Sequence, residues 1–263
     1  MLNFVIVNLK TYTNKYMKRK LFALLLALVA LSQSAGAQTL RRGDMDGDGE
    51  ISLSDMNKFI DILLGRHEYV DLGLPSGTLW ATCNVGANFP EEYGDYFAWG
   101  ETEPKTDYSW TTYKWCEGTN TTMTKYCSDE SYGTVDSLTV LEPEDDAAYR
   151  LWGSGWRMPT TAQRNELSTD AGYVTTDYNA TEHGVAGVRL TSKSNGNSIF
   201  LPYAGYYNGT TLVGVGHHAA INGVDMNATT NGTGYRWWRL GDVTAYNGTR
   251  CYGVTIRPVR SQP

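Results

Sequence analysis

The apolar pattern of the chain begins with an unbroken run from Leu21 to Leu31. The cationic stretch Met17-Lys-Arg-Lys precedes this run, and the small residues Ser34-Ala-Gly-Ala follow it. This order is typical of a secretory signal peptide, and the run is shorter than the ~20 residues that a helix needs to cross a bilayer. We predict export with cleavage after Ala37 and a true start of translation at Met17. A membrane anchor is the alternative, and no Cys follows the cleavage position to carry a lipid.

A second apolar pattern has the three- and four-residue spacing of an amphipathic helix that ends at Gly65. The residues on its apolar face are Leu53, Met56, Phe59, Ile60, Leu63 and Leu64. One helix cannot bury this face on itself. We expect the face to pack on the following domain, on a second copy of the chain or on a partner.

The short polar link Arg66-His67-Glu68 leads into a larger domain, in which the pattern predicts two helices. The first is expected from Ala147 toward Leu151, directly after an acidic stretch that suits a helix start. The second opens at Thr160, which has the spacing of a capping box with Gln163, and it ends near Leu167.

Short strands surround these helices. The predicted strands are Leu79–Val85, Asp95–Trp99, Val185–Thr191, Ser198–Leu201 and a closing strand up to Val259 in which Tyr252, Val254 and Ile256 alternate. Asn-Gly pairs that begin at Asn195, Asn208 and Asn247 predict hairpin turns. Two helices among antiparallel strands give an α+β fold class.

The charge of the chain excludes one class of partner. The leader holds five cations and no acid, which leaves 17 of the 22 Lys and Arg against 28 Asp and Glu, a net charge of −11 from Gln38 onward. A body this acidic, without a run of Lys or Arg, is not suited to binding nucleic-acid phosphates. The 18 Tyr, 8 Trp and 28 Gly fit a domain of short strands and turns.

The strongest chemical motif is the stretch from Asp44 to Asp55, D-M-D-G-D-G-E-I-S-L-S-D. Ca²⁺ takes six to eight oxygen ligands, and twelve-residue loops supply them from positions 1, 3, 5, 7, 9 and 12, with glycine at position 6 for a sharp turn. The predicted calcium ligands are the carboxylates of Asp44, Asp46, Asp48 and Asp55, the backbone carbonyl of Glu50, and Ser52 through a water. An acidic surface turn is the alternative, and the alternating acids around Gly49 favour calcium.

The segment Gly43 to Gly65 resembles one repeat of a type I dockerin. Such modules carry two loop-helix repeats and bind cohesin domains in extracellular polysaccharide-degrading assemblies. The resemblance implies that Asp44, Asp46, Asp48, Glu50 and Asp55 form the calcium shell. It also implies that Leu53 and Ser54, at loop positions 10 and 11, contact a cohesin-like or other surface protein. The chain departs from the pattern because it has no second repeat.

The segment from Tyr69 to Val259 resembles the bacterial family called the Fibrobacter succinogenes major paralogous domain. Five motifs carry the likeness in order: Y-V-D-L-G-L-P-S-G-T-L-W-A-T-C-N-V-G-A, Y-G-D-Y-F-A-W-G-E-T, G-W-R-M-P-T, I-F-L-P-Y-A-G-Y and V-T-I-R-P-V. That family is similar to C-type-lectin-like folds, in which two helices pack on a small twisted antiparallel sheet and the chain ends lie close together. The expected organisation is a leader over residues 1–37, a calcium repeat over 38–65 and this module over 69–259.

Sugar-binding C-type lectins carry E-P-N or Q-P-D followed by W-N-D, and this chain has neither in a plausible place. Glu142-Pro-Glu is the nearest string, and helix initiation explains it better. Sugar binding would then rest on aromatic stacking and loop hydroxyls. The nominated residues are Trp237 and Trp238, because consecutive residues of a strand face opposite sides and one of the two can be exposed.

Four cysteines in an exported protein suggest disulfides, and three pairings are open. Cys116 with Cys127 is the most local pairing, and it leaves Cys83 with Cys251; buried structural thiols are the alternative. The relatives of this fold that oxidise sulfatase cysteines need two thiols near the end of the domain, where this chain has only Cys251. Adjacent His217 and His218 have no ligand pattern around them.

No zinc-protease, nucleophile-elbow or phosphate-loop motif occurs in the sequence, so no enzyme activity is predicted. The expected function is that of a secreted, periplasmic or cell-surface binding protein that takes up Ca²⁺ and recognises a glycan or a protein partner in polysaccharide-related assemblies. A structural or adhesive surface component is the alternative. An enzyme that acts on polysaccharide is a third hypothesis, suggested only because dockerins occur in polysaccharide-degrading assemblies.

Overall fold

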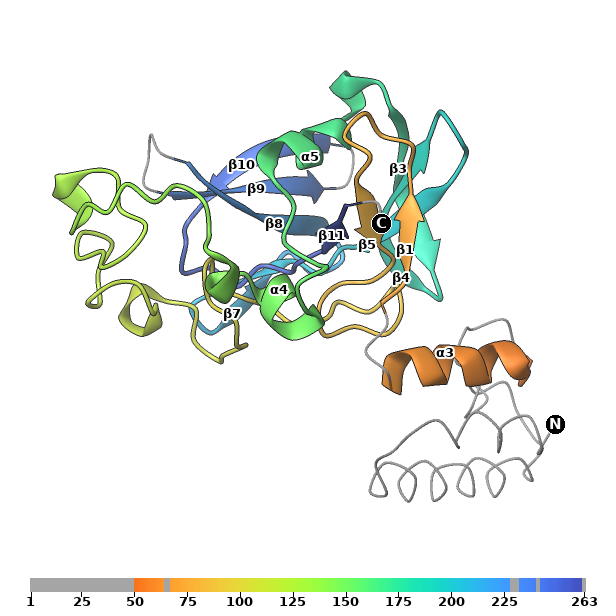
Figure 1. Cartoon of the computed structure of the whole chain (residues 1–263), viewed down its shortest axis with the longest axis horizontal. Helices are drawn as coiled ribbons and strands as arrows, with labels where there is room; N and C mark the ends of the chain where they lie inside the picture. The colour runs from red at the N-terminus through yellow and green to blue at the C-terminus, as the bar shows by residue number, and fades with distance from the viewer. Residues whose placement is uncertain (1–49, 64–66, 228–231, 240–241, 262–263) are drawn as a thin grey trace, which may run out of the picture. The chain divides into compact units, whose positions relative to one another are not determined.

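A computed structural model of the chain describes residues 50–63, 67–227, 232–239 and 242–261. The chain divides into two units, Met1–Leu64 and Gly65–Pro263 (Figure 1). The predicted signal peptide and the loop residues Asp44, Asp46 and Asp48 lie outside the described residues. In the part of the chain that is described, no helix has the length and the apolar character needed to cross a membrane.

The described part of the first unit is dominated by helix α3, Leu53–Leu63. The carboxylate of Asp55, in the first turn, accepts a hydrogen bond from the backbone N–H of Ser52 at 2.5 Å. An acid at this position satisfies a donor that the helix itself leaves open, and its charge suits the helix dipole. The predicted helix is therefore present, and its predicted end at Gly65 lies outside the described residues.

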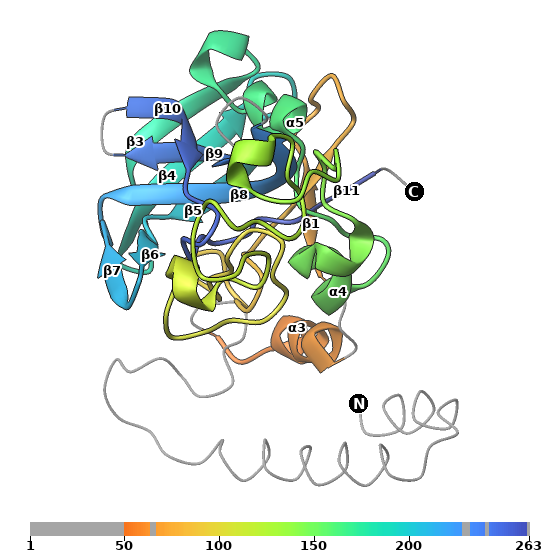
Figure 2. The ribbon, with the colours of Figure 1, turned by 90° about the vertical axis from the view of Figure 1, so that its left-hand side faces the viewer.

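The second unit, here called the module, is built on several small antiparallel sheets. Strands β3 (Val174–Glu182), β4 (Val185–Ser192) and β5 (Ser198–Pro202) form one sheet in that order. Strands β8 (His218–Asn227), β9 (Gly232–Arg239) and β10 (Asp242–Gly248) form a second sheet with β9 in the middle (Figure 2). Strands β6 (Tyr206–Asn208) and β7 (Thr211–Val213) make a hairpin.

A third sheet joins the two ends of the module. Strand β2 (Leu79–Ala81) pairs with β1 (Tyr69–Asp71) on one side and with β11 (Val259–Arg260) on the other. Both pairings are antiparallel. The first and the last strand of the module therefore flank the same central strand.

Two short α-helices have caps that explain their positions. Helix α4 (Ala147–Trp152) begins after Asp146, whose carboxylate accepts the N–H groups of Ala148 and Tyr149. Helix α5 (Thr161–Glu166) has the capping box between Thr160 and Gln163 that the sequence predicts. The 3₁₀ helices are η1 (Trp110–Thr112), η2 (Glu130–Tyr132), η3 (Pro143–Asp145) and η4 (Thr169–Ala171).

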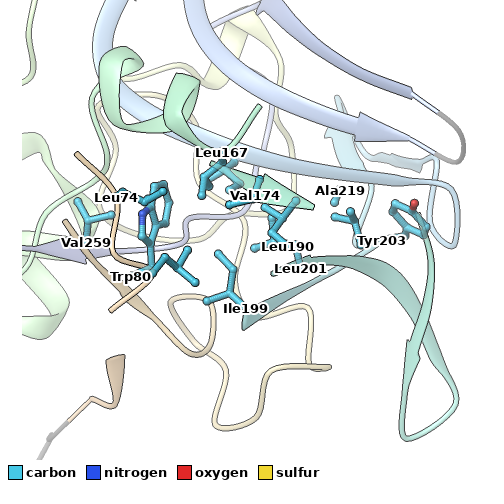
Figure 3. Close-up of a cluster of buried hydrophobic side chains, with 13 residues drawn as sticks. Leu74, Trp80, Leu167, Val174, Leu190, Ile199, Leu201, Tyr203, Ala219 and Val259 are labelled. Carbon is cyan, nitrogen blue, oxygen red and sulfur yellow. The ribbon is translucent and has the colours of Figure 1, made fainter. Parts of the chain in front are cut away.

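The largest core cluster lies where these elements meet. Figure 3 shows Trp80 of β2 among aliphatic side chains from β3, β4, β5 and β11. Trp80 is fully buried, as are Leu190 of β4 and Val259 of β11. A second cluster contains Trp99, Tyr126 and residues of α4, and a third contains Tyr108, Tyr113, Cys127 and Cys251. Burial of this apolar surface is the main force that holds the small sheets together.

The segment from residue 101 to 141 consists mainly of loops, with η1 and η2 as its helical turns (yellow-green in Figure 1). Its backbone is nevertheless anchored, because Tyr113, Met123, Tyr126 and Cys127 are buried in the core clusters. A long loop of this kind inside a compact domain is often where a protein binds its ligand.

One turn prediction and two strand predictions are corrected by the structure. Asn247-Gly248 is not a turn, because both residues pair with β9 at the end of β10. The predicted closing strand is reduced to β11. The predicted strand Asp95–Trp99 is reduced to one isolated bridge, in which Phe97 pairs with Val254. Residues 97–99 and 253–259 are buried, so the apolar pattern of these two segments reflects core packing and not strand pairing.

The polar link before the module is more ordered than the sequence indicates. The ring of His67 stacks on Trp152 with centroids 3.5 Å apart, and the edge of Trp152 meets Trp156. Burial lowers the pKa of His67 to about 4, so its ring is neutral at physiological pH. The guanidinium of Arg260 lies 5.2 Å from the ring of Tyr69 and 5.4 Å from that of Trp156. These contacts fix the first residues of the module against α4 and β11.

Few helices and several antiparallel sheets make the fold a mixed α+β fold, as the sequence predicts. The hairpins at Asn195-Gly196 and Asn208-Gly209 are also confirmed, because β4 pairs with β5 and β6 pairs with β7 around them.

Candidate functional site

The described end of the predicted calcium loop contains Glu50 and Asp55. Asp55 is only 3% exposed and stands at the start of α3, where the twelfth loop position would place the last ligand. Carboxylate and backbone carbonyl oxygens are the hard donors that Ca²⁺ prefers, so these residues fit the ion. The remaining predicted ligands, Asp44, Asp46 and Asp48, lie outside the described residues.

The two residues nominated for partner contact open helix α3. Leu53 is the first residue of α3 and is 58% exposed, and Ser54 follows it. An exposed leucine at a helix start is a reasonable contact point for another protein, although single exposed apolar residues are common on protein surfaces.

The tryptophans nominated for sugar stacking lie on β9, the central strand of its sheet. Trp237 pairs with Ala220 of β8, and Trp238 pairs with Ala219. The side chains of Trp237 and Trp238 lie outside the described part of the structure, so their exposure stays a prediction. Ala219 belongs to the largest core cluster, and Ala220 packs with Val254.

The predicted disulfides are not formed in the structure, where all four cysteines are thiols. The sulfur of Cys83 donates to the carbonyl of Ala87 at 3.3 Å, that of Cys116 to Trp110 at 3.1 Å, and that of Cys127 to Asp129 at 3.2 Å. Cys127 and Cys251 are buried in the third core cluster, and Cys116 packs against it. The correction follows from this packing, which directs three of the sulfurs at backbone carbonyls.

The adjacent histidines, which have no ligand pattern in the sequence, lie at the start of β8. His217 lies in the turn before β8, and His218 is its first residue. Within the described residues, no three or more His, Cys, Asp and Glu side chains are grouped so that they could hold a metal ion.

Among the described residues, one polar cluster of the module is not predicted from the sequence. At its centre is Asp145, the last residue of η3, which is 3% exposed. Its carboxylate accepts hydrogen bonds from the ammonium of Lys125 and from the hydroxyl of Tyr126, each at 2.7 Å. The ammonium of Lys114 lies 3.3 Å from its other oxygen. Lys125 also pairs with the carboxylate of Glu142, which is 47% exposed.

An aromatic ring completes this constellation, which we call the lysine–tryptophan site. The ammonium of Lys114 lies 4.0 Å from the centroid of the Trp115 ring, and that of Lys125 lies 4.8 Å from it. The indole N–H of Trp115 donates to the carbonyl of Gly100 at 2.8 Å, which fixes the ring. Attraction between ammonium groups and an indole face contributes about 0.5–2 kcal/mol per pair.

The backbone beside the lysine–tryptophan site is held in an uncommon conformation. Tyr126 and Ser137 have φ values of 57° and 59°, in the left-handed region that side chains disfavour. Asp136 holds them in place, because its carboxylate accepts the N–H groups of Tyr126, Cys127 and Leu138. Such strained positions often mark binding or catalytic sites.

The pKa values of three groups of the lysine–tryptophan site, Asp145, Lys125 and Tyr126, are shifted away from pH 7. Burial acts to raise the pKa of Asp145, but hydrogen bonds from Lys125 and Tyr126 outweigh it and lower the pKa. Burial also opposes the charge of Lys125, and its bonds to Asp145 and Glu142 raise its pKa. Burial raises the pKa of Tyr126 to about 12. The shifts keep Asp145 charged and leave the protons on Lys125 and Tyr126 near neutral pH, so the site presents a fixed pattern of charges and donors.

Comparison of the chain with protein family models, with curated proteins and with solved structures gives no match. The class of the protein therefore rests on its own architecture, a mixed α+β module that follows a unit with helix α3.

Proposed function

We propose that the protein is an exported, non-catalytic binding protein, in which a calcium-ordered loop-helix unit of dockerin type precedes a C-type-lectin-like module. The observation that supports this proposal is the burial of Asp55, the twelfth residue of the predicted loop, in the first turn of α3. Calcium would gather the loop carboxylates and hold the start of the helix in one conformation.

Three features of the module support its proposed class. It has two short α-helices, it has antiparallel sheets, and its first and last strands flank β2. The resemblance to the major paralogous domain implies all three. The ion pairs of Asp145 with Lys114 and Lys125 supply fixed charges that suit a binding role.

Calcium binding is tested by titration calorimetry and by thermal melting of the protein after the leader is removed. We expect one Ca²⁺ per chain, a rise in melting temperature with calcium, and loss of both effects in Asp44→Ala combined with Asp48→Ala. A ligand at 100 times its Kd stabilises the state that binds it by about 2.7 kcal/mol. Glu103→Ala combined with Asp170→Ala removes the same charge from exposed positions of the module and is the control. Identical melting curves with calcium and with chelator would contradict the proposal.

The nature of the partner is tested by one screen of glycans and envelope proteins, with and without calcium. A captured protein with no glycan bound would favour an adhesive or structural component. Release of reducing sugar from a polysaccharide panel would contradict the non-catalytic assignment.

A further inference from the structure

The lysine–tryptophan site holds two ammonium groups whose charges are neutralised to different extents. Lys125 has two carboxylate partners, Asp145 at 2.7 Å and Glu142, and its side chain is 21% exposed. Lys114 shares Asp145 at 3.3 Å, and its side chain is 51% exposed. An ammonium has three donors, so Lys114 retains donors for an acceptor that approaches from solvent.

The position of Lys114 suits a ligand that carries both an anion and an apolar face. Its ammonium lies 4.0 Å from the centroid of Trp115, which is half-buried and fixed through Gly100. A ligand carboxylate on Lys114 would bring the rest of the ligand beside the indole. Sugar rings have apolar C–H faces next to polar groups, and fixed amphipathic aromatic side chains are suited to such surfaces.

The site is also preorganised. Asp145 restrains both lysines, and Asp136 locks the strained backbone at Tyr126. The lysine side chains therefore lose less conformational entropy when a ligand binds than free surface lysines would lose.

We propose that Lys114, Trp115 and Lys125 form a binding site for a carboxylate-bearing sugar, a uronic acid. The ligand carboxylate accepts hydrogen bonds from Lys114, and the ligand ring lies beside the indole of Trp115, over which both ammonium groups are placed. Lys125 adds positive charge. The exposed carboxylate of Glu142 competes with the ligand for this charge. This assignment rests on the proposed binding function and names the class of ligand.

The test is a titration with an unsulfated chondroitin hexasaccharide, which contains glucuronic acid, at about 0.15 M salt, where the Debye length is about 8 Å and the acidic body is largely screened. We expect the carboxyl methyl ester of the same hexasaccharide to bind at least tenfold more weakly. Lys114→Gln should weaken binding of the acid by about tenfold, and Lys193→Gln, at an exposed lysine elsewhere, should change it less than twofold. Glu142→Gln should strengthen binding, which a purely structural role of Glu142 would not produce.

Two further probes separate other ligand chemistries. The methyl ester of chondroitin 4-sulfate keeps only the sulfate and is expected to bind as weakly as the unsulfated ester. A glutamate-rich peptide that binds as tightly as the hexasaccharide would overturn the sugar assignment in favour of an acidic peptide. An unchanged Kd in Lys114→Gln, equal binding of acid and ester, or no binding by the wild type at millimolar hexasaccharide would each overturn the proposal.

Titrations in calcium and in chelator separate this proposal from the calcium assignment. The lysine–tryptophan site lies within the second unit, so the effect of Lys114→Gln is expected in both conditions. Loss of calcium binding alone would leave that effect intact.

Discussion

Asp145→Ala is expected to destabilise the module by about 3 kcal/mol, because it removes the carboxylate that pairs with the ammonium groups of Lys114 and Lys125. The variant leaves Lys125, Lys114 and the hydroxyl of Tyr126 without their common acceptor. Urea unfolding followed by tryptophan fluorescence measures the loss. Glu144→Ala is the matched control, because Glu144 is an exposed acid in the same 3₁₀ turn and should change stability by less than about 0.5 kcal/mol.

The pH dependence of this loss follows from the direction of the pKa shift. The pKa of Asp145 is lower in the folded protein than its ordinary value of about 3.9. Its contribution is therefore present above pH ~4 and disappears as the pH falls through the folded-state pKa. The difference between wild type and Asp145→Ala should be constant from pH 5 to 8 and shrink in acid. A difference that grows below pH 4 would contradict the ion-pair account.

Trp80→Ala is expected to cost about 4 kcal/mol, the largest effect of a single core substitution here. Trp80 is fully buried in the cluster of Figure 3, where strand β2 meets buried residues of β3, β4, β5, β8 and β11. The indole N–H has no hydrogen-bond partner among the described residues, so the loss arises from packing and cavity formation.

Two companion variants define the origin of that loss. Trp80→Phe keeps most of the apolar surface and removes an unpaired N–H, so it should cost less than half as much as alanine. Leu151→Ala, at a 51% exposed position of α4, should have little effect. Chemical denaturation of all three variants under the same conditions gives the comparison, and equal losses in Trp80→Ala and Leu151→Ala would refute the assigned role of the core.

Local signals in the sequence predict local structure well in this chain. Thr160 and Gln163 close a capping box within three residues, and Asn195-Gly196 turns a hairpin whose strands are direct neighbours. Asn247-Gly248 carries the same signal but lies at the end of β10, because pairing with β9 overrides it. The segment around Val254 has the alternation of a strand but is mostly surrounded by core side chains.

The lysine–tryptophan site could not be predicted in the same way. Lys114 and Asp145 are 31 residues apart, and Lys125 is 20 residues from Asp145. A buried carboxylate with two ammonium partners leaves no periodic trace in the sequence, and the loops that bring these residues together have no strong turn motif. The two positive-φ residues, Tyr126 and Ser137, are not glycines, so they give no sequence signal either.

The sheet β1-β2-β11 has a consequence for how the module can be combined with other domains. The chain enters the module at β1 and leaves it at β11. Because both strands pair with β2, the entry and exit points lie close together. A unit of this kind can be inserted into a loop of a host protein without pulling the host's backbone apart. The same geometry permits circular permutation, with a short linker between the two ends.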